Sequence, residues 1–92
     1  MDVLQGSVIK SNAGHDKNCH FVVTKIDGNI VFIADGKERR LEKPKRKNMK
    51  HVSVTGETID ITDITNNKLR KLLNEFDIKV NKTAFNFQNS KS

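Results

Sequence analysis

The sequence predicts a small, mainly β protein: a five-stranded barrel followed by one C-terminal α-helix and a flexible tail. Three short apolar runs, two of them followed by an Asp-Gly dipeptide, predict the strands. An apolar stripe with helical spacing within residues 65–77 predicts the helix. The chain has 92 residues, which is enough for one small domain and not for two.

Three strands are predicted first, at residues 7–10, 21–26 and 29–34. Asp27-Gly28 separates the second strand from the third, and Asp35-Gly36 follows the third. Asp-Gly tolerates positive φ at both central positions of a type I′ turn, whose twist matches that of a β-hairpin. Two such signals in succession predict an antiparallel meander.

Two more strands are predicted after the meander. The fourth covers residues 37–42, with Leu41 as its one apolar anchor, and the fifth covers residues 51–54. Pro44 has no N–H group, so it is expected to end the fourth strand or to lie at its edge. Five short strands with tight turns and no helix among them predict a closed or nearly closed barrel.

A helix is predicted over residues 66–76. Its apolar stripe has members at i, i+3, i+4 and i+7, which are Leu69, Leu72, Leu73 and Phe76. Thr65 is the expected N-cap, which places Ile64 and Leu69 at the two positions of a hydrophobic staple. The stripe has two interpretations, packing on the barrel or docking of a partner protein. Packing is favoured because a helix must bury its stripe.

The predicted organisation is a barrel at residues 1–55, a linker at 56–64, a helix packed on the barrel at 65–77 and a flexible tail at 78–92. No apolar run resembles a signal peptide or reaches the roughly twenty residues of a membrane span. Cys19 is the single cysteine, which is typical of a reducing compartment. We therefore expect a cytoplasmic protein without a membrane association, monomeric when free.

Positive charge is concentrated in one window of the sequence. The chain has 17 Lys and Arg against 11 Asp and Glu, a net charge of +6. Residues 37–50 hold eight basic and two acidic residues, while the rest of the chain carries nine of each sign. A neutral body with one basic stripe indicates a polyanionic partner.

The segment at residues 6–18 has a glycine before the first strand and a glycine-led polar loop before the second. It resembles the KOW motif of ribosomal proteins and transcription elongation factors. Asn18 stands where that family usually has a second glycine, and Asn is well able to adopt the left-handed region. The residues of this KOW loop are Gly6, Val8, Gly14, His15, Asp16 and Asn18.

Further positions extend the likeness: Ile33-Ala34-Asp35-Gly36, Arg40-Leu41, Pro44-Lys45, Lys50-His51 and the helix at residues 69–76. Over residues 3–76 the chain looks like a bacterial group of short KOW-domain proteins. That group is similar to the eukaryotic- and archaeal-type large-subunit ribosomal KOW proteins. The resemblance implies an SH3-like barrel and a non-catalytic, ribosomal or ribosome-associated role in translation. The implied partners are ribosomal RNA and ribosomal proteins.

The basic stripe is suited to contacting phosphates, which position a protein on RNA without reading its sequence. The expected RNA-binding residues are Lys17, Arg39, Arg40, Lys43, Lys45, Arg46, Lys47 and Lys50. Two other interpretations remain. The stripe is a solvated loop with no partner, or it binds an acidic protein, since SH3-like barrels host many functions.

Catalytic and metal-binding patterns are absent from the sequence. Cys19-His20, taken with His15 and His51, lacks the paired ligand spacing of a structural zinc site. Asp60 and Asp63 lie on the predicted linker, and no nucleophile–base pattern accompanies them. We expect a protein that is not an enzyme and uses no cofactor or metal.

Overall fold

The computed structural model describes residues 3–14 and 17–91, with side chains as far as residue 79. Its elements are β1 (Ser7–Ser11), β2 (His20–Asp27), β3 (Ile30–Ala34), β4 (Lys45–Asn48), the 3₁₀ helix η1 (Met49–His51), β5 (Val52–Thr58) and α1 (Asn66–Lys91). All five strands form one antiparallel sheet in the order β4-β3-β2-β1-β5. The predicted meander of the first three strands is therefore confirmed.

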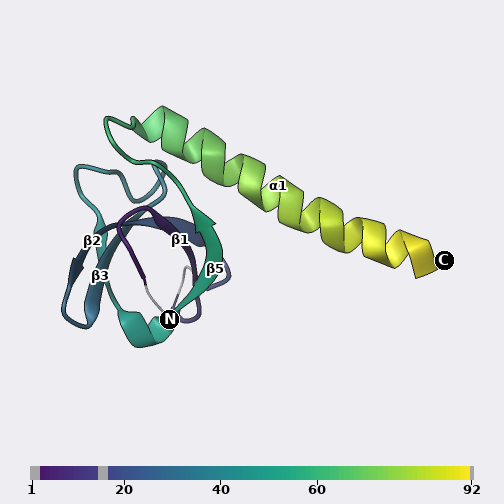
Figure 1. Ribbon diagram of the computed structural model, residues 1–92, viewed down its shortest axis with the longest axis horizontal. Coiled ribbons are helices and arrows are strands. Elements are labelled where there is room, and N and C mark those ends of the chain that lie inside the picture. The colour runs from purple at the N-terminus through teal and green to yellow at the C-terminus, as the bar shows by residue number, and fades with distance from the viewer. Residues whose placement is uncertain (1–2, 15–16, 92) are drawn as a thin grey trace.

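The sheet curves around a common interior but does not close into a barrel (Figure 1). Its two edges are β4 and β5, which η1 joins along the chain. Over residues 3–14 and 17–91, no ladder of hydrogen bonds connects these two edges. The closed or nearly closed barrel predicted from the sequence is thus replaced by an open, curved sheet.

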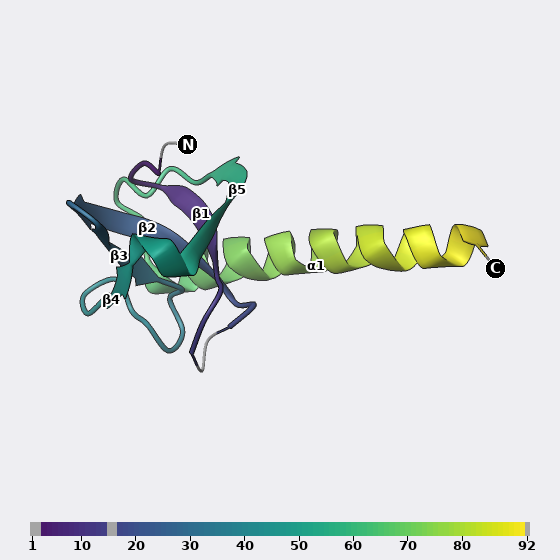
Figure 2. The ribbon, with the colours of Figure 1, turned by 90° about the horizontal axis from the view of Figure 1, so that it is seen from below.

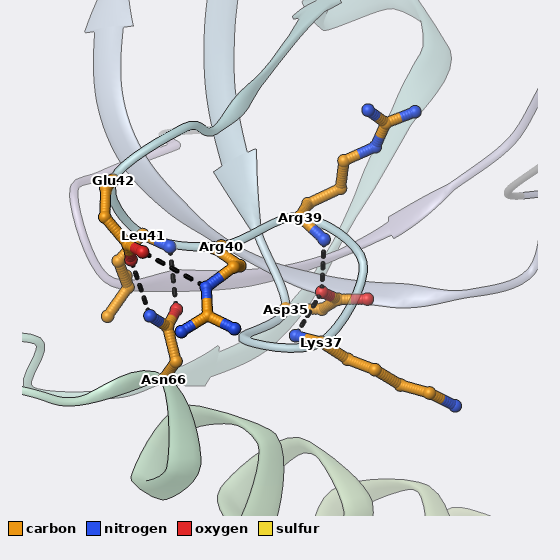
Figure 3. A network of polar contacts seen from close by, with 7 residues as sticks. All are labelled: Asp35, Lys37, Arg39, Arg40, Leu41, Glu42 and Asn66. Carbon is orange, nitrogen blue, oxygen red and sulfur yellow. Dashed lines mark hydrogen bonds and ion pairs between the residues drawn. The ribbon is translucent and has the colours of Figure 1, made fainter.

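The predicted fourth strand at residues 37–42 is wrong, because this segment is a loop. The Asp35 carboxylate accepts hydrogen bonds from the N–H groups of Lys37 and Arg39 (Figure 3). The carbonyl of Arg39 in turn accepts from the N–H groups of Asp35 and Gly36. Backbone groups that are satisfied by a local side chain and a tight turn cannot join a β-ladder.

The fourth strand forms later, immediately after Pro44. The N–H of Leu41 donates to the side chain of Asn66, which ties the end of the loop to α1 rather than to the sheet (Figure 3). β4 then begins at Lys45, so Pro44 precedes a strand instead of ending one. At that position its missing N–H removes no ladder bond.

The turn between β2 and β3 differs in detail from the type I′ prediction. Asp27 pairs with Ile30, so the two-residue loop consists of Gly28 and Asn29. Gly28 has φ +59, whereas Asn29 is not among the residues with positive φ. Positive φ at the first central position only, with Gly there, is the pattern of a type II′ turn.

Both faces of the sheet are buried at its centre, which explains the continuous apolar runs in the strands. One core cluster lies on the concave face and consists of Ile9, Phe21, Val23, Val31 and Ile33. The other lies between the sheet and α1 and consists of Val8, Val22, Ala34, Leu69 and Leu73. Neighbours in sequence alternate between the two clusters, as the pleat of a strand requires.

The N-terminus of α1 forms as the sequence predicts. The N–H of Lys68 donates to Oγ1 of Thr65 at 3.2 Å, so Thr65 is the N-cap. Ile64 packs against the cluster that contains Leu69, as expected of a hydrophobic staple. Because Leu69 and Leu73 are buried against the sheet, the stripe packs on the protein's own core.

The C-terminal half of the chain differs from the predicted linker, helix and tail. β5 continues to Thr58, so the first residues of the predicted 56–64 linker belong to the sheet. α1 does not end near residue 77 but runs to Lys91, through the predicted flexible tail. A helix of 26 residues is about 39 Å long, and Figure 2 shows that its second half extends beyond the sheet.

No helix within the described residues carries an apolar stretch long enough to cross a membrane.

Candidate nucleic-acid interface

The loop that resembles the KOW motif has the backbone its glycines suggest. Gly6 precedes β1 with φ +92, and a β-carbon there would lie 2.5 Å from the carbonyl oxygen of Ile59. Gly14 has φ +86 and Asn18 has φ +72. Asn18 therefore does adopt the left-handed conformation expected of it. His15 and Asp16 of the predicted motif lie outside the described residues.

Residues 12–19, here called the 12–19 loop, are held at both ends. The N–H of Asn18 donates to the carbonyl of Ser11, and the N–H of Ser11 donates to the carbonyl of Cys19. The N–H of Asn12 donates to the carbonyl of His51, next to β5. These bonds place Lys17, whose side chain is exposed, beside the sheet rather than on a free arm.

Lys47 takes a structural role that its sequence context did not indicate. Only 9% of this residue is exposed, and its Nζ donates to the carbonyl of Ala13 at 2.8 Å. In β4 it pairs with Val31, which belongs to the concave cluster, so its stem lies along the core. Lys47 therefore connects β4 to the 12–19 loop, and little of it remains exposed for the phosphate contact predicted for it.

The other basic residues of the window fall on two neighbouring segments. The first segment is residues 35–44 between β3 and β4, here called the 35–44 loop. Its basic residues, all exposed, are Lys37, Arg39, Arg40 and Lys43. Those of β4 and η1 are Lys45, Arg46 and Lys50, of which Arg46 and Lys50 are exposed and Lys45 is half-buried. Lys45 pairs with Ile33 and so faces the concave side, as Lys47 does. The predicted single stripe is thus divided between a loop and a sheet edge.

Among the exposed cations of the window, Arg40 is the one that pairs with a carboxylate in the described part of the chain. Its Nε lies 3.1 Å from Oε2 of Glu42. The other oxygen of Glu42 accepts a hydrogen bond from the side chain of Asn66 (Figure 3). The Asn66 amide, a backbone N–H and Arg40 together lower the pKa of Glu42 from 4.5 to about 2. Figure 3 also shows Lys37 and Arg39 extending from the loop in different directions, away from this network.

The lowered pKa of Glu42 predicts a specific pH dependence. Ionised Glu42 favours the folded state, so its contribution to stability is complete above pH 4.5 and is lost as the pH falls through about 2. We expect the melting temperature of the wild-type protein to exceed that of Glu42→Gln at neutral pH. The difference between the two melting temperatures should disappear as the pH falls from 4.5 to about 2. A difference independent of pH would contradict the network.

A hollow of about 390 Å³ lies between the end of the 12–19 loop, the 35–44 loop and α1. At its wall, Nδ1 of His20 lies 2.6 Å from Oδ1 of Asp77, and the rings of His20 and Phe76 form a T-shaped pair. The charged side chains around the hollow are Asp35, Lys37, Glu38, Arg39, Arg70 and Asp77. Because the two signs are balanced, this hollow does not by itself attract an anion. The His20–Asp77 pair instead attaches α1 to the start of β2.

Within residues 3–14 and 17–91, no three His, Cys, Asp and Glu residues gather closely enough to hold a metal ion. Cys19 is exposed and unpaired. Asp60 accepts a hydrogen bond from the N–H of Thr62, which lowers the pKa of its carboxyl group. Asp60 therefore stabilises a turn, and the net shift of its pKa is downward, whereas a general base needs a raised pKa.

The structure also adds two residues that the sequence did not single out. Lys25 of β2 and Phe32 of β3 are paired in register, and Phe32 is paired with Arg46 of β4. Lys25, Phe32 and Arg46 therefore form one row across three strands, on the face opposite the concave cluster. Only the pairing of strands far apart in sequence creates this row, so no local pattern could have indicated it.

No protein-family model matches the chain, and no curated protein matches it either.

Proposed function

We propose that this chain is a non-catalytic RNA-binding module of the SH3-like KOW type, ribosomal or ribosome-associated. Its exposed cations contact the phosphate backbone of structured RNA. The antiparallel meander, the glycine before β1 and the left-handed residues of the 12–19 loop support the KOW assignment. RNA as the polyanion follows from the resemblance to ribosomal KOW proteins.

One observation carries the proposal: the exposed cations of the window are largely uncommitted. Among the described residues, only Arg40 of this set forms an ion pair, with Glu42. The exposed residues without an ion pair are Lys37, Arg39, Lys43, Arg46 and Lys50. Cations that the protein does not neutralise internally retain their field for an external polyanion. Lys17, on the 12–19 loop, adds to the same interface.

The salt dependence of binding tests the proposal directly. If about six phosphates are neutralised, a log–log plot of affinity for structured RNA against salt concentration should have a slope of roughly −4 to −6. Fluorescence anisotropy with a labelled RNA hairpin measures it. A slope near zero would show that the cations do not contact phosphates.

Reversing charge at the edge formed by β4 and η1 tests which cations matter. We expect Arg46→Glu combined with Lys50→Glu to weaken RNA binding by about 100-fold, because two contacts are replaced by two repulsions. Both side chains are exposed, so the fold should persist. The matched control reverses Lys68 and Lys71 on α1, which are also exposed and lie outside the window. If both double variants lost the same RNA affinity, the effect would come from net charge alone and not from the edge formed by β4 and η1.

An acidic protein is the rival partner for the same cations. Sedimentation with ribosomes before and after ribonuclease treatment distinguishes the two. Loss of the protein from the pellet after RNA digestion supports the RNA proposal, whereas sedimentation that survives digestion indicates a protein partner.

A further inference from the structure

The outer face of β2, β3 and β4 presents an aromatic ring between two cations. Phe32 pairs with Lys25 on one side and with Arg46 on the other. Lys25 and Arg46 are exposed, and Phe32 is half-buried. Phe32 packs in neither core cluster, unlike Val31 and Ile33 beside it. Of the two phenylalanines in the strands, only Phe32 thus lies outside the cores.

An irregularity in β2 creates this arrangement. Val23 pairs with Ile33 and Lys25 pairs with Phe32, so the register between β2 and β3 shifts at Thr24. Three residues of β2 therefore lie opposite two residues of β3. Without the shift, Lys25 would follow the alternation of Val23 and face the concave cluster. A β-bulge redirects a side chain in this way. The hydroxyl of Thr24 donates to the carbonyl of Phe32 at 3.1 Å, which holds the two strands together at the shift.

The cation that lies over the ring is held there only by a weak contact. Nζ of Lys25 lies over the Phe32 ring, 5.7 Å from its centroid. A cation–π contact at an exposed site changes the equilibrium constant for forming the contact by only about two- to fivefold. Stacking of a base on an aromatic side chain corresponds to about 5- to 150-fold in affinity. A base can therefore displace the ammonium group of Lys25 from the face of the ring. The displaced ammonium group then lies beside the ring, where it can contact the phosphate of the same nucleotide.

We propose that Phe32, flanked by Lys25 and Arg46, is a stacking site for one unpaired base of the bound RNA. This inference rests on the proposed RNA-binding function and specifies the kind of RNA: one with a loop, bulge or single-stranded end next to the structured part. A base inside a duplex is covered by its neighbours on both faces, so it cannot stack on Phe32. The flanking cations provide the phosphate contacts on either side.

The test compares a single-stranded RNA with a fully paired duplex of the same length. We expect Phe32→Leu to weaken binding of the single strand by at least about fivefold and to change duplex binding by less than about twofold. Phe32→Tyr keeps an aromatic ring and should retain the affinity of the wild-type protein for both. Circular dichroism establishes that each variant is folded. A single strand bound equally by Phe32→Leu and by the wild-type protein would overturn the inference.

A second measurement uses the unmodified protein. A single-stranded RNA carrying 2-aminopurine should lose fluorescence on binding if the base stacks on Phe32, and unchanged fluorescence in the bound state would also overturn the inference. The two proposals fail in different ways. The wild-type protein could bind RNA without changing 2-aminopurine fluorescence, and Phe32→Leu could bind the single strand as tightly as the wild-type protein does. In that case only the stacking site is wrong. If it binds neither RNA, the proposed function fails and the stacking site with it.

Discussion

We expect Leu69→Ala to lower the free energy of unfolding by about 3–5 kcal/mol. Leu69 is fully buried in the cluster between α1 and the sheet. Its removal leaves a cavity among side chains from β1, β2 and β3, which cannot collapse without moving the sheet. Since small domains have only about 5–15 kcal/mol of stability in total, this change should bring the protein close to unfolding. Urea denaturation followed by circular dichroism measures the effect.

Leu72 provides the matched control, because it is the same residue type on the same helix. It is only partly buried and lies outside both core clusters. We expect Leu72→Ala to cost about 1 kcal/mol, since little apolar area returns to water. Equal losses at Leu69 and Leu72 would contradict the packing of α1 on the sheet.

Gly36→Ala is expected to lower the free energy of unfolding by about 2–4 kcal/mol. Gly36 is the second residue of the 35–44 loop and has φ +77, a conformation that L-residues adopt at a cost. A β-carbon there would also overlap the carbonyl oxygen of Asn66 and crowd the N–H of Arg70, both on the first turns of α1. Backbone atoms of a helix cannot move aside as a flexible side chain can. Thermal unfolding of the variant measures the loss.

Gly56→Ala separates the two causes of that loss. Gly56 has φ +88, but no atom beyond its two chain neighbours lies within 4 Å of the position its β-carbon would occupy. We expect this control to lose only about 1 kcal/mol, from the left-handed conformation alone. If Gly36→Ala were no worse than Gly56→Ala, the close approach between the 35–44 loop and α1 would be wrong.

The position of Lys47 changes how the interface should be tested. Sequence alone places Lys47 beside Arg46 in one basic run, so the two are natural partners for a charge reversal. In the structure the ammonium group of Lys47 is held by the carbonyl of Ala13 in a buried position. A Glu at this position would bury an unpaired charge next to a carbonyl oxygen and would destabilise the fold. Lys50, which is exposed, replaces it in the proposed experiment.

Local patterns were sufficient to predict the elements that depend on neighbours in the chain. The meander, the N-cap at Thr65 and the left-handed Asn18 each depend on a few adjacent residues, and each is confirmed. The buried stripe of α1 follows from a spacing of three and four residues in the same way. The concentration of positive charge in residues 37–50 is also a property of the chain alone.

The arrangement of those charges depended on long-range contacts. Whether residues 37–42 form a strand was decided by Asp35 and by Asn66, which lies on a helix 25 residues beyond Leu41. Lys47 became buried, and Phe32 became flanked by cations, because strand pairing set which face each residue occupies. Hydrophobic spacing indicates whether a residue can be buried. It does not determine which hydrogen bonds a loop forms or which register two strands adopt, because both depend on contacts between distant segments.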